Sequence, residues 1–269
     1  MFEALTEPYP PYEAIGIRVG DEYRQLTTSL LQIENEFYGK IRAKRVIRPG
    51  ERPLHALRER GVEYVEVRLM DLDPFCPVGI GAQTIRLLDV FLLHCLLHES
   101  APDTPAEIAE VGRNQNRVAA RGREPGLLLE RQGQEVALAT WGGQLLGECE
   151  PIAAALDAAH GIAAYGDALR SARRALDDPE SVPSARVLSA MKQHHGSYVR
   201  FTLEQSLRHA AELKRLPVSA EAEQRFCQLA KESIDEQRQI EAGDTLPFEQ
   251  YRQQYLAPER LNIRSRHKN

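Results

Sequence analysis

The chain has 269 residues, of which 42% are hydrophobic and 27% are charged, and its formal net charge is −5. This composition is typical of a soluble globular protein with a buried core, and the acidic balance argues against a general nucleic-acid-binding protein. No apolar run approaches the length of a membrane span, and no secretion signal is recognisable. We therefore expect a cytoplasmic protein, a single domain over residues 1–269, that binds neither nucleic acid nor membrane.

The N-terminal part of the chain is predicted to supply the strands. Three prolines predict an irregular lead-in over residues 1–20, and strand-forming residues at 23–31 predict an extended segment. From 32 to 45, polar side chains such as Glu34 and Tyr38 occupy the even positions, while the apolar ones lie at odd positions. Because successive side chains of a strand point to opposite faces, this stretch predicts a strand with one solvated face.

A second stretch, residues 63–70, repeats the alternation, with Glu66 and Arg68 on its polar side. If the two strands share a sheet, carboxylates and guanidinium groups share one face. Carboxylate oxygens ligate Mg²⁺ and arginine binds phosphate, and an ATP-consuming site needs both. The solvated face of any antiparallel sheet also carries mixed charges, so the alternation leaves both interpretations open.

Helices are predicted to follow the strands. A turn at 49–53 precedes a short helix at 54–60, a loop rich in proline occupies 71–77, and a helix with one broad apolar stripe covers 83–98. His94 and His98 lie four residues apart on that last helix, a spacing that can bind a metal. Because the sequence places no third ligand nearby, a structural role is favoured for the pair.

Thr104-Pro-Ala-Glu107 has the residues of a capping box and predicts the start of a helix that ends near Arg121. Arg117, Arg121 and Arg123 lie at the end of this helix. They either complement the helix dipole or bind an anionic group, and the sequence does not decide between the two roles.

The remainder of the chain is predicted to be almost entirely helical beyond a turn at 141–143. The expected helices cover 144–159, 163–177, 183–194, 197–215, 219–242 and 246–256. The charged helix within 219–242 is expected to be solvated, and residues 264–269 to form a frayed tail. The four cysteines form no Cys-x-x-Cys pair, so we expect reduced thiols. The predicted class is α+β, with a partial antiparallel sheet near the N-terminus followed by a mainly helical C-terminal region.

Several runs in this order resemble the proteobacterial type of glutamate–cysteine ligase (γ-glutamylcysteine synthetase). The runs are Leu31-Gln-Ile-Glu-Asn-Glu-Phe-Tyr38 with Ile41-Arg42 and Lys44-Arg45, Gly61-Val-Glu-Tyr-Val-Glu-Val-Arg68, Asp73-Pro-Phe-Cys-Pro-Val-Gly79, Asn116-Arg117 with Gly122-Arg-Glu-Pro-Gly-Leu127, and Ser184-Ala-Arg-Val-Leu188. Lys40 and Ala43 stand where the family has prolines. The resemblance spans residues 10–256 but corresponds only to the C-terminal half of a family chain.

The resemblance implies a glutamine-synthetase-like sheet and the first step of glutathione biosynthesis. ATP would phosphorylate the γ-carboxylate of L-glutamate, and the amine of L-cysteine would displace the phosphate. It further implies that Glu66 is a Mg²⁺ ligand, that Arg68 is a catalytic residue facing the phosphoryl group, and that Tyr38 lines the cysteine-binding site. Most of the metal-binding carboxylates of the family belong to the missing N-terminal half, so we expect the chain alone to be inactive.

Two other functions compete with the ligase. The chain could be a non-catalytic binding or interaction subunit that keeps the C-terminal half of the fold. It could also be a phosphate- or nucleic-acid-binding module built on the basic segment at 40–48.

Overall fold

The computed structural model describes residues 1–260, so the tail predicted at 264–269 lies outside the described residues. The chain divides into two compact units, one formed by Met1–Asp71 with Val218–Asn269 and the other by Leu72–Pro217. The single-domain organisation stays a prediction. The α+β class is confirmed, since helices dominate and all strands of residues 1–260 pair antiparallel in three two-stranded sheets.

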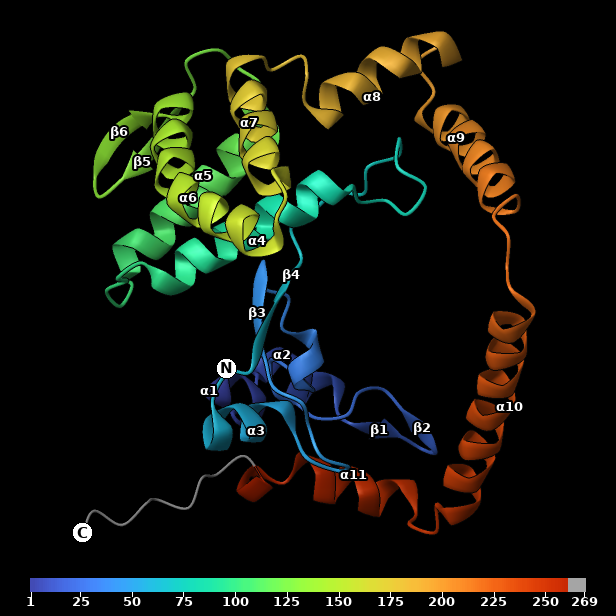
Figure 1. Ribbon diagram of the computed structural model, residues 1–269. Coiled ribbons are helices and arrows are strands. Elements are labelled where there is room, and N and C mark those ends of the chain that lie inside the picture. Colours follow the sequence, from blue (N-terminus) through green and yellow to red (C-terminus); the bar gives the residue numbers. More distant parts are fainter. Residues whose placement is uncertain (261–269) are drawn as a thin grey trace. The chain divides into compact units, whose positions relative to one another are not determined.

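The first unit combines short helices, two small sheets and two C-terminal helices (Figure 1). Its elements are α1 (Phe2–Thr6), α2 (Pro10–Ile15), β1 (Arg18–Val19), β2 (Glu22–Tyr23), the 3₁₀ helix η1 (Glu34–Glu36), β3 (Ile41–Lys44), α3 (Pro53–Arg60), β4 (Tyr64–Val67), α10 (Ala220–Gly243), α11 (Phe248–Leu256) and η3 (Pro258–Arg260).

Helix α11 is joined to the N-terminal segment of this unit by polar and aromatic contacts. The Tyr23 hydroxyl donates to Glu249 at 2.7 Å, and Arg252 donates to the carbonyl oxygen of Leu26 at 2.6 Å. The rings of Tyr23 and Phe248 meet edge to face, with centroids 4.9 Å apart. By contrast, α10 has no buried residue, which confirms the solvated helix that its charges predict.

The second unit is a helical assembly with one hairpin. Its elements are α4 (Ala82–Leu97), α5 (Pro105–Arg121), β5 (Leu128–Arg131), β6 (Gln134–Ala137), α6 (Leu138–His160), α7 (Ala164–Asp177), α8 (Pro183–Met191), the 3₁₀ helix η2 (Lys192–His194) and α9 (Tyr198–Leu213). Helices α4, α6 and α7 pack on one another around Val90, Cys149, Ala153 and Leu169. Apolar side chains of three helices thus form the core of this unit.

The N-terminal segment differs from the prediction. Residues 1–20 contain the helices α1 and α2, and α2 begins with a proline, which is tolerated in the first helical turn. The prediction of an extended segment at 23–31 is wrong, because only Glu22–Tyr23 forms a strand there. The reason is local: the buried Gln25 donates its side-chain amide to the carbonyl oxygens of Tyr12 and Gly16, at 2.7 and 2.9 Å, so this segment is bound to α2.

The turn expected at Trp141-Gly142-Gly143 is also wrong, because these residues lie within α6. A Cβ atom on Gly142 would lie 2.9 Å from Leu176 of α7, and one on Gly143 would collide with the guanidinium of Arg173. The two glycines therefore allow α7 to approach α6 closely. The hairpin β5–β6 was not predicted at all, whereas the helices expected at 54–60, 83–98 and from Thr104 onward are confirmed.

Candidate functional site

The two strands that the alternation predicted pair with each other in an antiparallel ladder, β3–β4 (Figure 1). Arg42 lies opposite Glu66 and Lys44 opposite Tyr64. Directly opposite residues of a ladder project from the same face, so a carboxylate and two cationic side chains share one face. The prediction of a shared sheet is confirmed, although the first strand covers only residues 41–44 of the predicted 32–45.

Glu66 is the centre of the polar face. Its carboxylate lies 3.1 Å from Lys44 Nζ and 3.0 Å from Arg68 Nε, and Arg68 Nη2 donates a further hydrogen bond at 3.2 Å. Hydrogen bonds from Arg68 and then from Lys44 hold the pKa of Glu66 below its usual value, so the carboxylate is ionised at neutral pH. One carboxylate is thus paired with two cations on a half-exposed surface.

Glu34 departs from the predicted pattern. It was expected on the solvated face, but it lies in η1 and is only 2% exposed, because its carboxylate binds Arg52 in a buried ion pair. Arg42 donates to the backbone carbonyl of Glu34 at 2.9 Å, so this buried pair also positions the β3 side chain opposite Glu66. Residue alternation does not reveal the pair, since Arg52 lies in a different segment.

The loop between β3 and β4 is braced by a second ion pair. Arg60 donates to both oxygens of Glu51, at 2.6 and 2.8 Å, and the Arg48 backbone N–H donates at 2.9 Å. These hydrogen bonds, those of Arg60 first, lower the pKa of Glu51 to about 2. Arg60 also donates to the carbonyl oxygen of Val46 at 3.0 Å, which links α3 to the end of β3.

A groove of about 610 Å³ follows β3 within the first unit. It is lined by Arg42, Lys44 and Tyr64 of the ladder and by Leu54 and Leu57 of α3, among others. Small-molecule sites in proteins have volumes of this order and combine apolar walls with a few polar groups. Lys44 contacts Glu66 and also lines the groove, so the polar face continues into a space that could hold a ligand.

Tyr38 is the third residue with a predicted role. It lies between η1 and β3, and it is 84% exposed. Within residues 1–260 its hydroxyl makes no hydrogen bond to Glu66 or Arg68. The structure therefore brings Glu66 and Arg68 together, but it does not bring Tyr38 to them.

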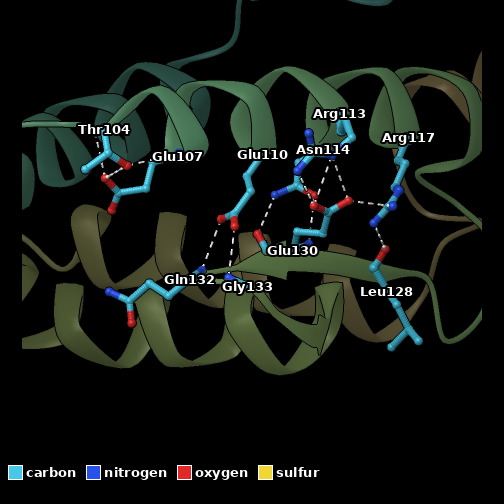
Figure 2. A network of polar contacts seen from close by, with 10 residues as sticks. All are labelled: Thr104, Glu107, Glu110, Arg113, Asn114, Arg117, Leu128, Glu130, Gln132 and Gly133. Atoms are coloured by element: carbon cyan, nitrogen blue, oxygen red, sulfur yellow. Dashed lines mark hydrogen bonds and ion pairs between the residues drawn. The ribbon is translucent and has the colours of Figure 1, made fainter.

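Arginines of α5 form ion pairs with carboxylates of the second unit. Figure 2 shows Arg113 and Arg117 on either side of Glu130, at 2.5 and 2.7 Å, and Asn114 bonded to the Glu130 backbone. Arg121 binds both oxygens of Glu124 at 2.6 Å. These pairs attach α5 to β5 and to the loop that follows α5, which supports a structural role for Arg117 and Arg121.

Arg123, the last of the three arginines predicted at the end of this helix, contacts Glu180 at 3.4 Å. All four cysteines lie among the described residues, and they are unpaired thiols, as expected.

No helix within residues 1–260 has both the length and the apolar character needed to cross a membrane.

Comparison with known proteins finds similar chains that are described as glutamate–cysteine ligases. The family model described as glutamate-cysteine ligase matches residues 1–118. A glutamate–cysteine ligase of Bordetella parapertussis is 44% identical over 259 residues, which are 96% of this chain and 49% of the relative. One of Azotobacter vinelandii is 44% identical over 254 residues, which are 94% of this chain and 48% of the relative.

A solved structure of a glutamate–cysteine ligase is also similar to this chain. The crystal structure of glutamate–cysteine ligase from Francisella tularensis in complex with AMP is 31% identical, with a TM-score of 0.86, and the match covers 95% of this chain and 50% of that chain. The chain thus spans about half the length of the curated relatives that it matches.

Proposed function

The chain is a partial homologue of the glutamate–cysteine ligases, and we propose that it supplies the C-terminal half of an enzyme that joins the γ-carboxylate of L-glutamate to L-cysteine with ATP. This reaction is the first step of glutathione biosynthesis. Because it draws on ATP, we place the protein in the cytoplasm. The observation that carries the proposal is the pairing of Glu66 with Lys44 on one face of the β3–β4 ladder and with Arg68 directly after β4.

The pairing of Glu66 with two cations suits a site that receives a metal-bound phosphate. Without a ligand the Glu66 carboxylate offsets one of the two positive charges, so the group of Glu66, Lys44 and Arg68 keeps a net charge of +1. Lys44 and Arg68 would hold phosphate oxygens of a bound nucleotide in place of the carboxylate, and Glu66 would then be available as a metal ligand. The uncompensated positive charge favours the approach of an anionic phosphate group to this face.

Mg²⁺ fits the donor that this chain provides. It is usually bound through one or two carboxylates together with substrate phosphates and waters, and Glu66 is an ionised, half-exposed carboxylate. When bound, the ion would neutralise charge on the transferring phosphoryl oxygens. Glu66 is therefore our choice of metal ligand from this half of the enzyme.

Arg68 is our choice of catalytic residue. Its guanidinium already binds Glu66 through two nitrogens, and the same planar fork matches two phosphoryl oxygens. Tyr38 would bind the cysteine substrate, because its exposed hydroxyl can donate to or accept from a small polar ligand. Further carboxylates and the other wall of the pocket would come from the N-terminal half.

The proposal is tested by reconstitution. We expect the purified chain alone to release no phosphate with glutamate, cysteine, ATP and Mg²⁺, and to gain this activity when mixed with the N-terminal half of the Bordetella parapertussis ligase. Glu66→Gln should raise the Mg²⁺ concentration needed for activity, whereas Glu232→Gln on the exposed helix α10 should not. Activity of the chain alone, or equal Mg²⁺ dependence of the two variants, would contradict the proposal.

A non-catalytic interaction subunit is the second candidate. It is favoured by α10, where Phe226, Ile234 and Ile240 are exposed and no residue is buried. Stable association with the complementary half without any glutamate-dependent phosphate release would support this alternative over the ligase.

A further inference from the structure

Two histidines at the end of α4 lie beside a carboxylate of α6. His94 and His98 are one helical turn apart, and Glu148 reaches them from the neighbouring helix. Ligand atoms of the three side chains all lie within 4.8 Å of one another. The sequence identified the histidine pair but gave no third ligand, because Glu148 is 54 residues from His94 along the chain.

The distances suit a small divalent ion. His94 Nε2 and Glu148 Oε2 are 3.0 Å apart. Two ligand atoms bound to a tetrahedral zinc ion are separated by about 3.3 Å, given bonds of about 2.0–2.2 Å. The His94 and His98 rings have centroids 5.3 Å apart, so a small shift of side chains would place all three donors around one ion.

His98 has one ring nitrogen free to bind a metal. Its Nδ1 lies 2.7 Å from the backbone carbonyl oxygen of Glu99. A carbonyl only accepts, so Nδ1 carries the proton and Nε2 has a free lone pair. Metal-binding histidines commonly make this second hydrogen bond, which fixes the tautomer and the ring orientation.

His94 is poorly satisfied by the protein alone. It is only 9% exposed, and its Nδ1 is buried without a hydrogen-bond partner while Nε2 faces Glu148. A metal ion on Nε2 would keep the proton on Nδ1 and leave that atom without a partner, so the case for the ion rests on Nε2 alone. The short contact between Nε2 and Glu148 marks where the ion would lie.

The hydrophobic core holds the two helices at this separation. Val90, one turn before His94, packs in the same buried cluster as Cys149, which follows Glu148. The backbone positions of the ligands are therefore set by core packing, which reduces the ordering that binding requires.

We propose that His94, His98 and Glu148 bind one Zn²⁺ ion, with water in the fourth position, and so connect α4 to α6. Two imidazoles and one carboxylate form a recognised zinc ligand set, whereas Mg²⁺ prefers oxygen donors. The other His-containing acidic group in the described chain, Glu51, His55 and Glu59, is a weaker candidate because Glu51 is bound by Arg60.

The test is a titration of the full chain, freed of metal, with ZnCl₂ in an isothermal calorimeter. We expect one ion per chain, and an affinity lower by more than about 100-fold in His98→Gln and Glu148→Gln, since even residues outside the ligand shell change metal affinity by about 10–100-fold. The matched control is His160→Gln, at the other end of α6, which should bind zinc like the wild type. Circular dichroism of each variant verifies that it is folded.

Co²⁺ provides a second measurement that needs no variant. It should give the visible absorption of a tetrahedral site without a thiolate charge-transfer band, and Zn²⁺ should displace it while Mg²⁺ should not. Absence of saturable zinc binding by the wild-type chain, a thiolate band, or unchanged affinity in folded His98→Gln would each overturn the proposal.

Discussion

Arg52 and Glu34 form an ion pair that is almost completely buried, with exposed fractions of 1% and 2%. Arg52 Nε and Nη2 each donate to a different carboxylate oxygen at 3.0 Å. The guanidinium also lies over the ring of Tyr255, 5.3 Å from its centroid. The pair therefore joins η1, the start of α3 and helix α11 within the first unit.

Replacing Arg52 should destabilise this unit strongly. In Arg52→Met the carboxylate of Glu34 stays buried without its partner, and such a loss typically costs about 3–5 kcal/mol. The free energy of unfolding, measured with urea, should fall by this amount. The control is Arg238→Met, because Arg238 and Asp235 form an exposed pair, and it should change little. A loss below about 1 kcal/mol for Arg52→Met would mean that water reaches the pair.

Glu51 should make stability depend on pH in the acid range. Its pKa is lowered from 4.5 to about 2 in the folded protein, chiefly by Arg60. Between these values the unfolded chain binds more protons than the folded chain, so stability falls as pH falls. Glu51→Gln lacks this titration, and its melting temperature should fall less steeply than that of the wild type from pH 5 to pH 3.

Glu249 should add to the same acid dependence, since Arg252 and then Tyr23 lower its pKa to about 2 as well. The variant Glu51→Gln with Glu249→Gln should therefore have a flatter profile than either single variant. Parallel profiles for the wild type and both single variants would contradict the assignment of these carboxylates.

Arg68→Lys should impair catalysis in the reconstituted enzyme without unfolding it. Lysine keeps the charge but loses the planar fork, so we expect kcat to fall by at least about tenfold. Arg238→Lys, on the exposed face of α10, is the matched control and should leave kcat unchanged. If lysine at position 68 supports full activity, Arg68 does not bind the phosphoryl group through two nitrogens.

The cysteines should differ in their reaction with iodoacetamide. Cys149 is 1% exposed in the core of the second unit, whereas Cys227 is exposed on α10. We expect Cys227 to be alkylated at least about tenfold faster, as followed by peptide mass spectrometry. Both should react at similar rates in urea, and equal rates in the native protein would show that the α4–α6–α7 core opens readily.

Sequence motifs predicted an element correctly where that element is determined by neighbouring residues. The start of α5 was found because Thr104 and Glu107 form a capping box, and the hydrogen bonds of that box are present. The glycines at 142 and 143 misled the prediction because their role, close contact with α7, is set by residues about 30 positions away. The β5–β6 hairpin was missed because its turn, Gln132-Gly133, is not one of the Asn-Gly or Asp-Gly pairs that mark hairpins most strongly. In the structure this turn donates both N–H groups to Glu110 of α5 (Figure 2).

In the candidate site, too, contacts between neighbouring residues could be predicted, and contacts between distant segments could not. Residues two apart on a strand project from one face, so the closeness of Glu66 and Arg68 could be predicted from the sequence alone. The approach of Lys44 depends on strand register, and the burial of Glu34 depends on Arg52. Likewise, Glu148 joins the two histidines only through the packing of α4 against α6.

The first unit is discontinuous in sequence, because residues 1–71 are completed by a segment that begins at Val218. The contacts from Tyr23 to Glu249 and from Arg252 to Leu26 each span 226 positions. During translation the ribosome synthesises all of the second unit before α11 emerges, so residues 72–217 can fold while the first unit is still incomplete. The surfaces around Tyr23 and Arg52 that α11 contacts stay uncovered until α11 is synthesised, and a chaperone that covers them at that stage would favour correct folding.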